Sequence, residues 1–176
     1  MLILTGAPGS GKSTVAGLLA CKWPRAVHIE CDQFFHFIKA GYIEPWKPES
    51  HEQNTTVMRI VGQAAAAYAA GGYFTIIDGI VLPSWFLSPL TDALGAAGHA
   101  VAYAVLRAPL AVCHARVKDR AHGGRGDAAV VERLWREFAG LGPLERHAID
   151  NGTQDPGATA DLLAAQLTSL LVAAQQ

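Results

Sequence analysis

The sequence predicts a three-layer α/β/α fold, in which a parallel sheet carries helices on both faces, because strand-like and helix-like segments alternate along the chain. The apolar runs predicted as strands are 2–5, 26–30, 74–77, 99–106 and 148–149. The segments with helical spacing of apolar residues are 13–22, 33–40, 51–70, 83–94, 110–120, 128–139 and 158–174. At 176 residues, 51% of them hydrophobic, the chain is large enough for a complete core. No repeat or linker divides it, so we expect a single domain over residues 1–176.

The first predicted strand runs into a glycine-rich turn that has the composition of a phosphate-binding loop, or P-loop. Residues 6–14 are G-A-P-G-S-G-K-S-T, which fits the pattern G-x-x-x-x-G-K-[ST]. Between a strand and a helix, such a loop points backbone N–H groups and the positive end of the helix dipole at one anion. The alternative is a chance glycine-rich turn. The residues expected to hold the phosphates of a nucleoside triphosphate are Gly6, Ala7, Pro8, Gly9, Ser10, Gly11, Lys12, Ser13 and Thr14.

Two aspartates follow predicted strands, at the sheet edge where α/β proteins bind ligands. Asp32 comes after the strand 26–30 and is a candidate for contact with a substrate; the alternative is an N-cap of the next helix. Asp78 closes the strand 74–77, where a carboxylate can hold Mg²⁺ beside the phosphates together with the Ser13 hydroxyl. For Asp78 the alternative is an ordinary Asp-Gly turn.

Arginines near a second glycine-rich segment, 122–127, suggest a lid. Arg116 and Arg120 lie four residues apart, on one face of a predicted helix, and Arg125 lies within the glycine segment. Guanidinium groups on a hinged segment can close over a triphosphate and neutralise its charge. We place this lid at about residues 110–139; the alternative is a solvated helix face on which the arginines pair with neighbouring carboxylates.

The composition indicates which cellular compartment and which classes of binding partner to expect. The formal net charge is -1 and no long run of one sign occurs, so we do not expect a nucleic-acid partner. Three widely spaced cysteines without a C-x-x-C pattern favour a reducing compartment. No signal-peptide pattern precedes the first strand, and the apolar stretch 162–174 is too short to span a bilayer. We therefore expect a cytoplasmic protein without a membrane partner, either a monomer or a homodimer.

The order of the motifs resembles that of the small P-loop kinases, a group that includes nucleotide, gluconate and shikimate kinases and chloramphenicol phosphotransferase. The resemblance rests on four segments, G-A-P-G-S-G-K-S-T at 6–14, H-I-E-C-D-Q-F-F at 28–35, T-I-I-D-G at 75–79 and H-A-R-V-K-D-R at 114–120. The pattern is most similar to the chloramphenicol phosphotransferase type. The resemblance implies a P-loop NTPase fold, with a five-stranded parallel sheet in the order 2-3-1-4-5 and a helical lid.

The resemblance also implies transfer of the γ-phosphoryl group of ATP, with Mg²⁺, to a hydroxyl of a small molecule. Lys12 would hold the phosphates, and Asp32 would orient or deprotonate the acceptor hydroxyl. Because aspartate is a weak base at neutral pH, we expect orientation to be its larger contribution. Ser13 and Asp78 would position the metal. The lid residues expected to contact the nucleotide, the first two as catalytic residues that stabilise developing charge, are Arg116, Arg120 and Arg125.

The region between Asp32 and Asp78 bears on the acceptor. Nucleotide kinases use several arginines for a second phosphate, whereas this region has only Lys39, Lys47 and Arg59 as cations. The D-G-[FY]-P-R segment of adenylate kinases is not reproduced after Asp78. The acceptor region, which extends to residue 86, supplies aromatic and neutral polar side chains instead, so we expect a neutral or partly apolar acceptor, such as an antibiotic-like compound or a metabolite. The residues expected to contact it are Asp32, Phe35, Trp46 and Asp78.

Other functions remain open at this stage. One alternative is a nucleoside monophosphate kinase, and a second is a toxin-like kinase of a sugar nucleotide. A third is a nucleotide-binding regulator without catalysis, since P-loops can serve binding alone. A GTPase is not expected, because no N-K-x-D guanine motif occurs in the fourth or fifth strand region.

Overall fold

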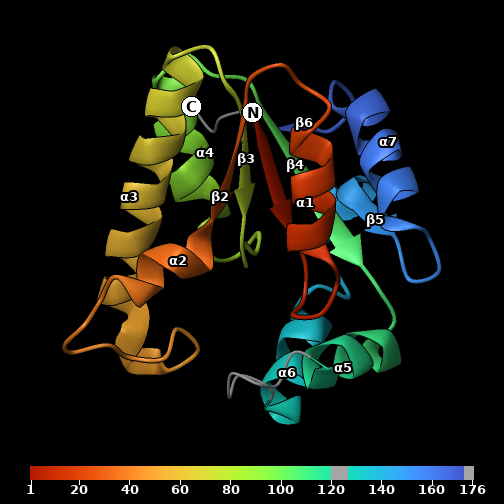
Figure 1. Cartoon of the computed structure of the whole chain (residues 1–176). Helices are drawn as coiled ribbons and strands as arrows, with labels where there is room; N and C mark the ends of the chain where they lie inside the picture. The colour runs from red at the N-terminus through yellow and green to blue at the C-terminus, as the bar shows by residue number, and fades with distance from the viewer. Residues whose placement is uncertain (120–126, 173–176) are drawn as a thin grey trace.

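A parallel sheet forms the centre of the molecule (Figure 1). The computed structural model describes residues 1–119 and 127–172. The strands, in chain order, are β1 (Leu2–Thr5), β2 (Ala26–Glu30), β3 (Phe74–Asp78), β4 (Val101–Arg107) and β5 (Ala148–Asp150). They lie side by side in the order β2-β3-β1-β4-β5, and all their pairings are parallel. The expected sheet order is confirmed. A short strand that the sequence did not predict, β6 (Leu171–Val172), pairs antiparallel with β4.

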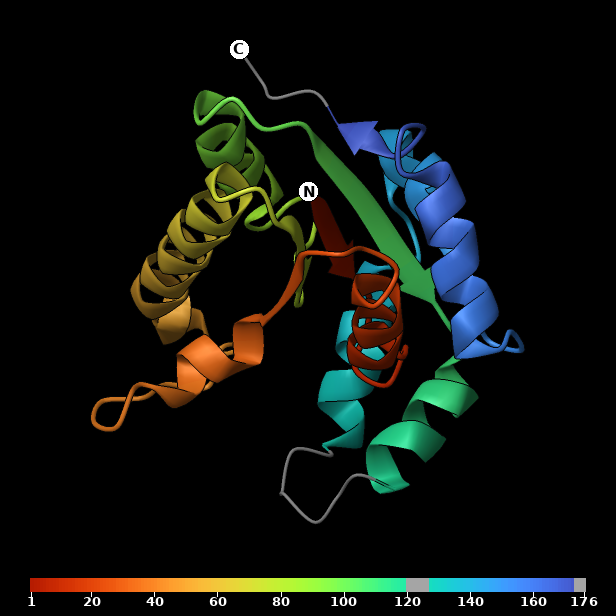
Figure 2. The same ribbon diagram turned by 45° about the horizontal axis from the view of Figure 1, so that its top comes forward.

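Alternate residues of the strands supply two separate hydrophobic layers. In β1, Ile3 faces one layer while Leu2 and Leu4 face the other, because successive side chains of a strand point to opposite faces. Helices α3 (His51–Ala70) and α4 (Leu87–Ala96) cover the face of Ile3, and α1 (Lys12–Ala20) and α7 (Pro156–Gln166) cover the opposite face (Figure 2). This confirms the predicted three layers.

Several helix boundaries differ from the prediction, and in α2, α4 and α7 the structure shows a local reason. Helix α2 (Cys31–His36) begins directly after β2, so Asp32 lies in its first turn and is not its N-cap. Helix α4 begins only at Leu87, because the preceding residues form a turn in which Leu82 bridges to Phe86. Helix α7 begins earlier, at Pro156, where Asp155 caps it by accepting hydrogen bonds from two backbone N–H groups. It ends at Gln166, and the chain then turns into β6.

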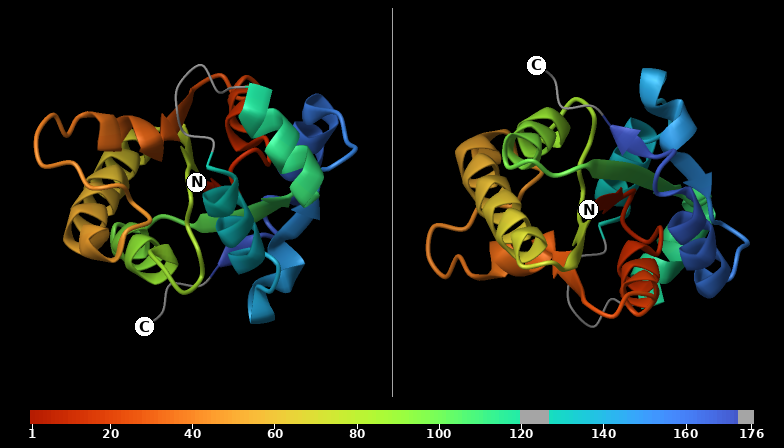
Figure 3. Two further views of the ribbon diagram at one scale, coloured as in Figure 1. Left: turned by 90° about the horizontal axis from the view of Figure 1, so that it is seen from below. Right: turned by 90° about the horizontal axis from the view of Figure 1, so that it is seen from above.

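The lid region contains two helices at the carboxyl end of the parallel strands, α5 (Leu110–Asp119) and α6 (Ala128–Glu137). Asp127 caps α6 by accepting a hydrogen bond from the Ala129 N–H. The Trp135 indole N–H donates a hydrogen bond to the Ala108 carbonyl at 2.9 Å and so connects α6 to the segment after β4. Residues 120–126, which include Arg120, Arg125 and the glycines of the second glycine-rich segment, lie outside the described residues. Seen from below, the lid helices and the loop after α2 lie on opposite sides of the sheet end (Figure 3, left).

The described residues also include two short 3₁₀ helices, η1 (Pro48–Ser50) before α3 and η3 (Gly142–His147) before β5. Among the helices of the described part of the chain, none is both long enough and apolar enough to cross a membrane.

Candidate active site

The P-loop joins β1 to α1 and owes its shape to close packing against two neighbouring segments. A Cβ atom added to Gly6 would lie 2.3 Å from the Leu106 carbonyl oxygen of β4. One added to Gly9 would lie 2.4 Å from the Cys113 carbonyl oxygen of α5. Both glycines also have positive φ angles, 145° and 82°. Only glycine fits at these two positions, so the loop is held in one conformation at the N-terminus of α1.

Lys12 is the first residue of α1, and its side chain folds back over the loop. The ammonium group donates a hydrogen bond to the Ala7 carbonyl at 3.3 Å. Gly11, immediately before it, has φ 96° and brings the chain from the loop into the helix. The positive charge of Lys12 therefore lies at the same place as the N-terminal end of the helix, where an anion is favoured.

Asp78 lies at the tip of β3 beside the P-loop and is 4% exposed. Burial raises the pKa of its carboxyl group, but other contacts outweigh burial and lower the pKa below its ordinary value. These are a hydrogen bond from His28 at 3.1 Å, the charge of Lys12 and a hydrogen bond from the Ser13 hydroxyl. The carboxylate is thus ionised and in contact with Ser13, as the predicted magnesium site requires. Among the described residues, no group of three or more His, Cys, Asp or Glu side chains could hold a metal ion.

A cavity of about 480 Å³ opens beside the P-loop. It is in the size range of small-molecule sites. Pro8 of the P-loop lines it at one end, and the predicted acceptor residues Asp32, Phe35 and Trp46 line it too. Asp78 is not among its described lining residues. Further side chains come from segments distant in sequence, namely Tyr42, Met58, Ile80, Trp85, Phe86, Val130, Arg133, Leu134 and Glu137.

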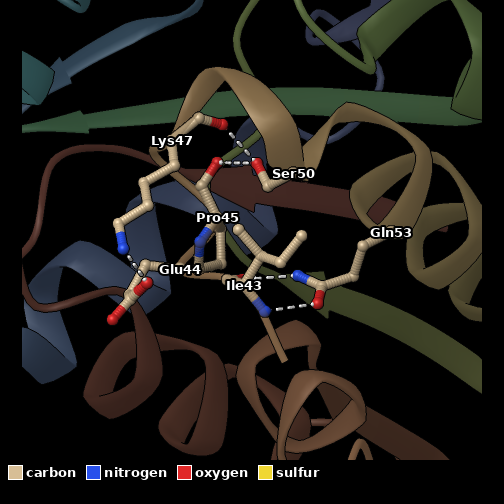
Figure 4. A network of polar contacts seen from close by, with 6 residues as sticks. All are labelled: Ile43, Glu44, Pro45, Lys47, Ser50 and Gln53. Atoms are coloured by element: carbon tan, nitrogen blue, oxygen red, sulfur yellow. Dashed lines mark hydrogen bonds and ion pairs between the residues drawn. The ribbon is translucent and has the colours of Figure 1, made fainter. Parts of the chain in front are cut away.

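The wall of the cavity contributed by the loop between α2 and α3 is fixed by polar side chains of α3 and η1 (Figure 4). The Gln53 amide brackets the backbone of Ile43, accepting from its N–H at 2.8 Å and donating to its carbonyl at 2.6 Å. Asn54 donates to the Pro45 carbonyl and to the Ser50 hydroxyl, both at 2.8 Å. Gln53 and Asn54 therefore shape the loop that carries Trp46.

The opposite wall follows β3 and is fixed from the core. Val81 is clamped at both backbone groups, because its N–H donates to the Thr5 hydroxyl at 2.9 Å and its carbonyl accepts from the Tyr103 hydroxyl at 2.8 Å. A few residues later Phe86 adopts φ 65°, a left-handed conformation that is costly for a side chain of this size. The two hydrogen bonds of Val81 and this turn together place Trp85 and Phe86 in the cavity wall.

Helix α6 forms the third wall, which sequence reasoning did not assign to the acceptor. Val130, Leu134 and Glu137 line the cavity from this helix. Arg133, also in the wall, donates to the Trp46 carbonyl at 3.2 Å and so connects α6 to the loop between α2 and α3. The spacing of these residues by three or four positions on one helix face is the sequence signal that could have indicated a shared surface.

Comparison with known proteins agrees with this geometry. Residues 1–141 match the AAA_33 family, described as an AAA domain. The chain belongs to this family. No sequence among curated proteins matches it.

Solved structures similar to this AAA_33 chain share its architecture over almost the whole length. The tunicamycin resistance protein of Deinococcus radiodurans has a TM-score of 0.69 at 20% identity, with 98% of each chain covered. A sugar kinase from Janibacter sp. HTCC2649 has a TM-score of 0.66 at 21% identity, covering 96% of this chain and 94% of the other. The APS kinase of Mycobacterium tuberculosis, solved with AMPPNP and APS, has a TM-score of 0.69 at 18% identity, covering 95% and 96%. At these identities the similarity establishes the P-loop kinase fold.

Of the three arginines predicted to lie in the lid, only Arg116 is among the described residues. Arg116 lies on the outer side of the P-loop, where it donates to the Gly9 and Ser10 carbonyl oxygens, both at 3.3 Å. Arg120 and Arg125 lie outside the described residues, so their roles stay predictions. A residue that the sequence did not single out, Asn151, joins Arg116 at the same carbonyl, with its amide nitrogen 2.7 Å from the Ser10 oxygen. Its position just after β5, at the carboxyl edge of the sheet, was the available signal.

Proposed function

We propose that the chain is a single P-loop kinase domain over residues 1–176 that transfers the γ-phosphoryl group of ATP to a hydroxyl group of a small molecule. One observation carries the proposal. The phosphate-binding loop and Asp32 line the same cavity, from Pro8 on one side and from α2 on the other, and the cavity volume of about 480 Å³ suits a small acceptor. The proposed donor and acceptor sites would then adjoin each other, an arrangement that a protein which only binds nucleotide does not need.

The reaction assigns each residue a task. The acceptor oxygen forms a bond to the γ-phosphorus, the bond to the β–γ bridging oxygen breaks, and the acceptor proton leaves. Asp32 accepts a hydrogen bond from the acceptor hydroxyl and orients it, or takes its proton as the bond forms. Lys12 and the backbone N–H groups of the P-loop hold the phosphates and offset the negative charge that develops on them.

Ser13 and Asp78 fit the role of holding Mg²⁺ with the nucleotide. Their oxygen atoms are of the kind that Mg²⁺ prefers, and Asp78 has a lowered pKa and lies against Ser13. A bound Mg²⁺ would neutralise phosphate charge. The sparse acidic surroundings also suit Mg²⁺, since this ion takes most of its ligands from phosphates and water when it binds with a nucleotide.

The acceptor is neutral or partly apolar in this proposal. Aromatic rings from α2, the loop after it and the segment after β3 line the cavity. Among the described lining residues, Lys47 pairs with Glu44 at 2.7 Å, and Arg133 donates to a backbone carbonyl. Neither cation is positioned as a dedicated partner for a second phosphate, which favours an uncharged hydroxyl compound over a nucleoside monophosphate. We expect the enzyme to act in the cytoplasm on such a compound, without a nucleic-acid partner.

The test is ATP consumption measured with and without a panel of acceptors. The panel contains neutral aromatic alcohols, sugars, sugar nucleotides and nucleoside monophosphates, with Asp32→Asn as the catalytic control. We expect turnover that depends on a neutral hydroxyl compound and is lost in the variant. Turnover with nucleoside monophosphates alone would overturn the acceptor assignment. Tight ATP binding without turnover on any acceptor would identify a regulator instead.

A further inference from the structure

Two side chains from separate elements converge on one peptide group of the P-loop. Asn151, directly after β5, donates from its amide nitrogen to the Ser10 carbonyl at 2.7 Å. Arg116, on α5, donates to the same oxygen at 3.3 Å and to the neighbouring Gly9 oxygen at 3.3 Å. Asn151 is only 4% exposed and Ser10 is fully buried, so water competes little for these bonds. The orientation of the Ser10–Gly11 peptide is therefore fixed from outside the loop.

Fixing this carbonyl also fixes the direction of an N–H group. In a trans peptide the C=O and N–H bonds point in opposite directions, and the chain has no cis peptide among its described residues. With the Ser10 carbonyl held toward Asn151 and Arg116, the Gly11 N–H points to the other side of the loop. The preceding N–H, of Ser10, is already bonded to the Ala7 carbonyl at 3.1 Å. The hydrogen bonds from Asn151 and Arg116, called here the P-loop clamp, thus orient the Gly11 N–H at the N-terminus of α1, where an anion is favoured.

Within the part of the chain that the structure describes, the side chain of Asn151 forms a hydrogen bond only through its amide nitrogen. Its side-chain oxygen is buried and has no hydrogen-bond partner among the described residues. A purely structural asparagine would be expected to satisfy both ends of its amide. Among the described residues, the side chain of Asn151 makes its one hydrogen bond to the phosphate-binding loop. This placement assigns the residue to that loop rather than to the core around it.

We propose that Asn151 is a positioning residue for the phosphate-binding loop, which aims the Gly11 N–H at the phosphates and shares this task with Arg116. The inference rests on the proposed nucleotide binding and adds a residue to it. On this proposal, Asn151 affects the binding of the phosphate chain of the nucleotide rather than the binding of its base. The proposal also gives Arg116 a role before the chemical step, because an arginine bonded to the loop backbone orders the site while ATP binds.

The chain offers a matched control in Asn54. This asparagine is also buried, and its amide nitrogen also donates to a loop carbonyl, that of Pro45 at 2.8 Å. Asn54→Ala therefore removes hydrogen bonds of the same kind, to the Pro45 carbonyl and to the Ser50 hydroxyl, from the acceptor side of the site. Any loss of affinity that comes only from a loosened structure should appear in both variants.

The experiment measures the affinity of the full chain for ATP and for inorganic tripolyphosphate by calorimetry. We expect Asn151→Ala to weaken both ligands on the order of tenfold, and Asn151→Asp, which sets a carboxylate against the Ser10 oxygen, to weaken them more. Asn54→Ala should bind tripolyphosphate like the wild type. The inference is overturned if Asn151→Ala binds tripolyphosphate normally, whether ATP is weakened or not. A wild type that binds neither ligand would overturn the proposed function itself.

A second measurement tests the inference on the wild type and can be repeated on one variant. In a ¹⁵N-labelled wild-type sample, adding tripolyphosphate should shift the Gly11 amide proton downfield, because that N–H gains a charged acceptor. In Asn151→Ala the Gly11 shift should be smaller at saturation. A Gly11 signal that does not move in the wild type, while tripolyphosphate binds, would contradict the clamp even if the variants do not fold.

Discussion

The proposed donor and acceptor halves of the site are built in different ways. The core of the donor half is one contiguous segment, residues 6–14, which offers mainly backbone groups to a phosphate. The acceptor half is a cavity whose side chains come from α2, α3, α6 and two loops. Phosphate binding needs N–H groups in a fixed curve, which a short glycine-rich segment provides. Recognition of a particular small molecule needs walls of defined shape, which only several elements together provide.

The two halves also differ in charge. At the donor edge, Lys12, Asp78 and His28 form a tight polar group in which the pKa of Asp78 is lowered. At the acceptor side, the lining is dominated by aromatic and aliphatic groups, with Asp32 at the boundary. Changes on the donor side should therefore alter transfer with any acceptor, whereas changes in the cavity should alter the choice of acceptor. The predictions below test this division, from the largest expected effect to the smallest.

Lys12→Ala should have the largest effect. Without the ammonium group, the phosphates lose a charge that acts most strongly in the transition state, so we expect transfer to fall about 10³-fold. Acceptor binding, measured by calorimetry, should stay within a factor of two. If acceptor binding were lost as well, the two halves would not be separable.

Asp32→Asn should lower turnover by about 10²-fold or more but leave ATP binding intact. The isosteric amide is a weaker hydrogen-bond acceptor than the carboxylate, so it orients the acceptor hydroxyl less well, and it cannot take the acceptor proton. The measurement is turnover under saturating ATP, with ATP affinity determined in parallel. Normal transfer by this variant would remove Asp32 from the mechanism.

Arg133→Ala should raise the KM for the acceptor about threefold without changing the KM for ATP, because the bond to the Trp46 carbonyl is partly solvated and modest in energy. Arg136→Ala is the matched control. It lies on the same helix, pairs with Glu132 and does not line the cavity. Equal effects of the two substitutions, or an effect of Arg133→Ala on ATP, would show that α6 does not belong to the acceptor half.

The smallest effect concerns the pH dependence of stability at Asp78. Its pKa is lowered in the folded state, so its contribution is present above the ordinary carboxyl pKa of about 4 and is lost as pH falls through the lower, folded value. In urea unfolding between pH 3 and pH 7, the wild type should lose stability relative to Asp78→Asn only below about pH 4. A relative gain in stability as pH falls from 7 to 5 would instead mean that burial dominates and raises this pKa.

Much of the fold could be predicted from the sequence because its signals are local. Helix α3 has the predicted bounds, and the strand order follows from the motifs and the resemblance they carry. Boundaries that depend on tertiary contacts were missed. Helix α4 starts later than predicted because the segment before it is pinned to the core through Val81. Strand β6 is only two residues long and exists because it pairs with the edge of β4.

The sequence by itself determined the phosphate-binding loop, since its glycines, lysine and serine are consecutive and their backbone geometry is a local property. It also placed Asp32 and Asp78 at the sheet edge, because parallel strands all end there. Only the tertiary structure decided what surrounds them. Arg133 meets Trp46, and Asn151 meets Ser10, across separations in sequence that no periodicity spans. Such contacts arise from how helices and loops pack around the sheet, so the walls of the acceptor cavity and the clamp on the P-loop emerge only in the folded molecule.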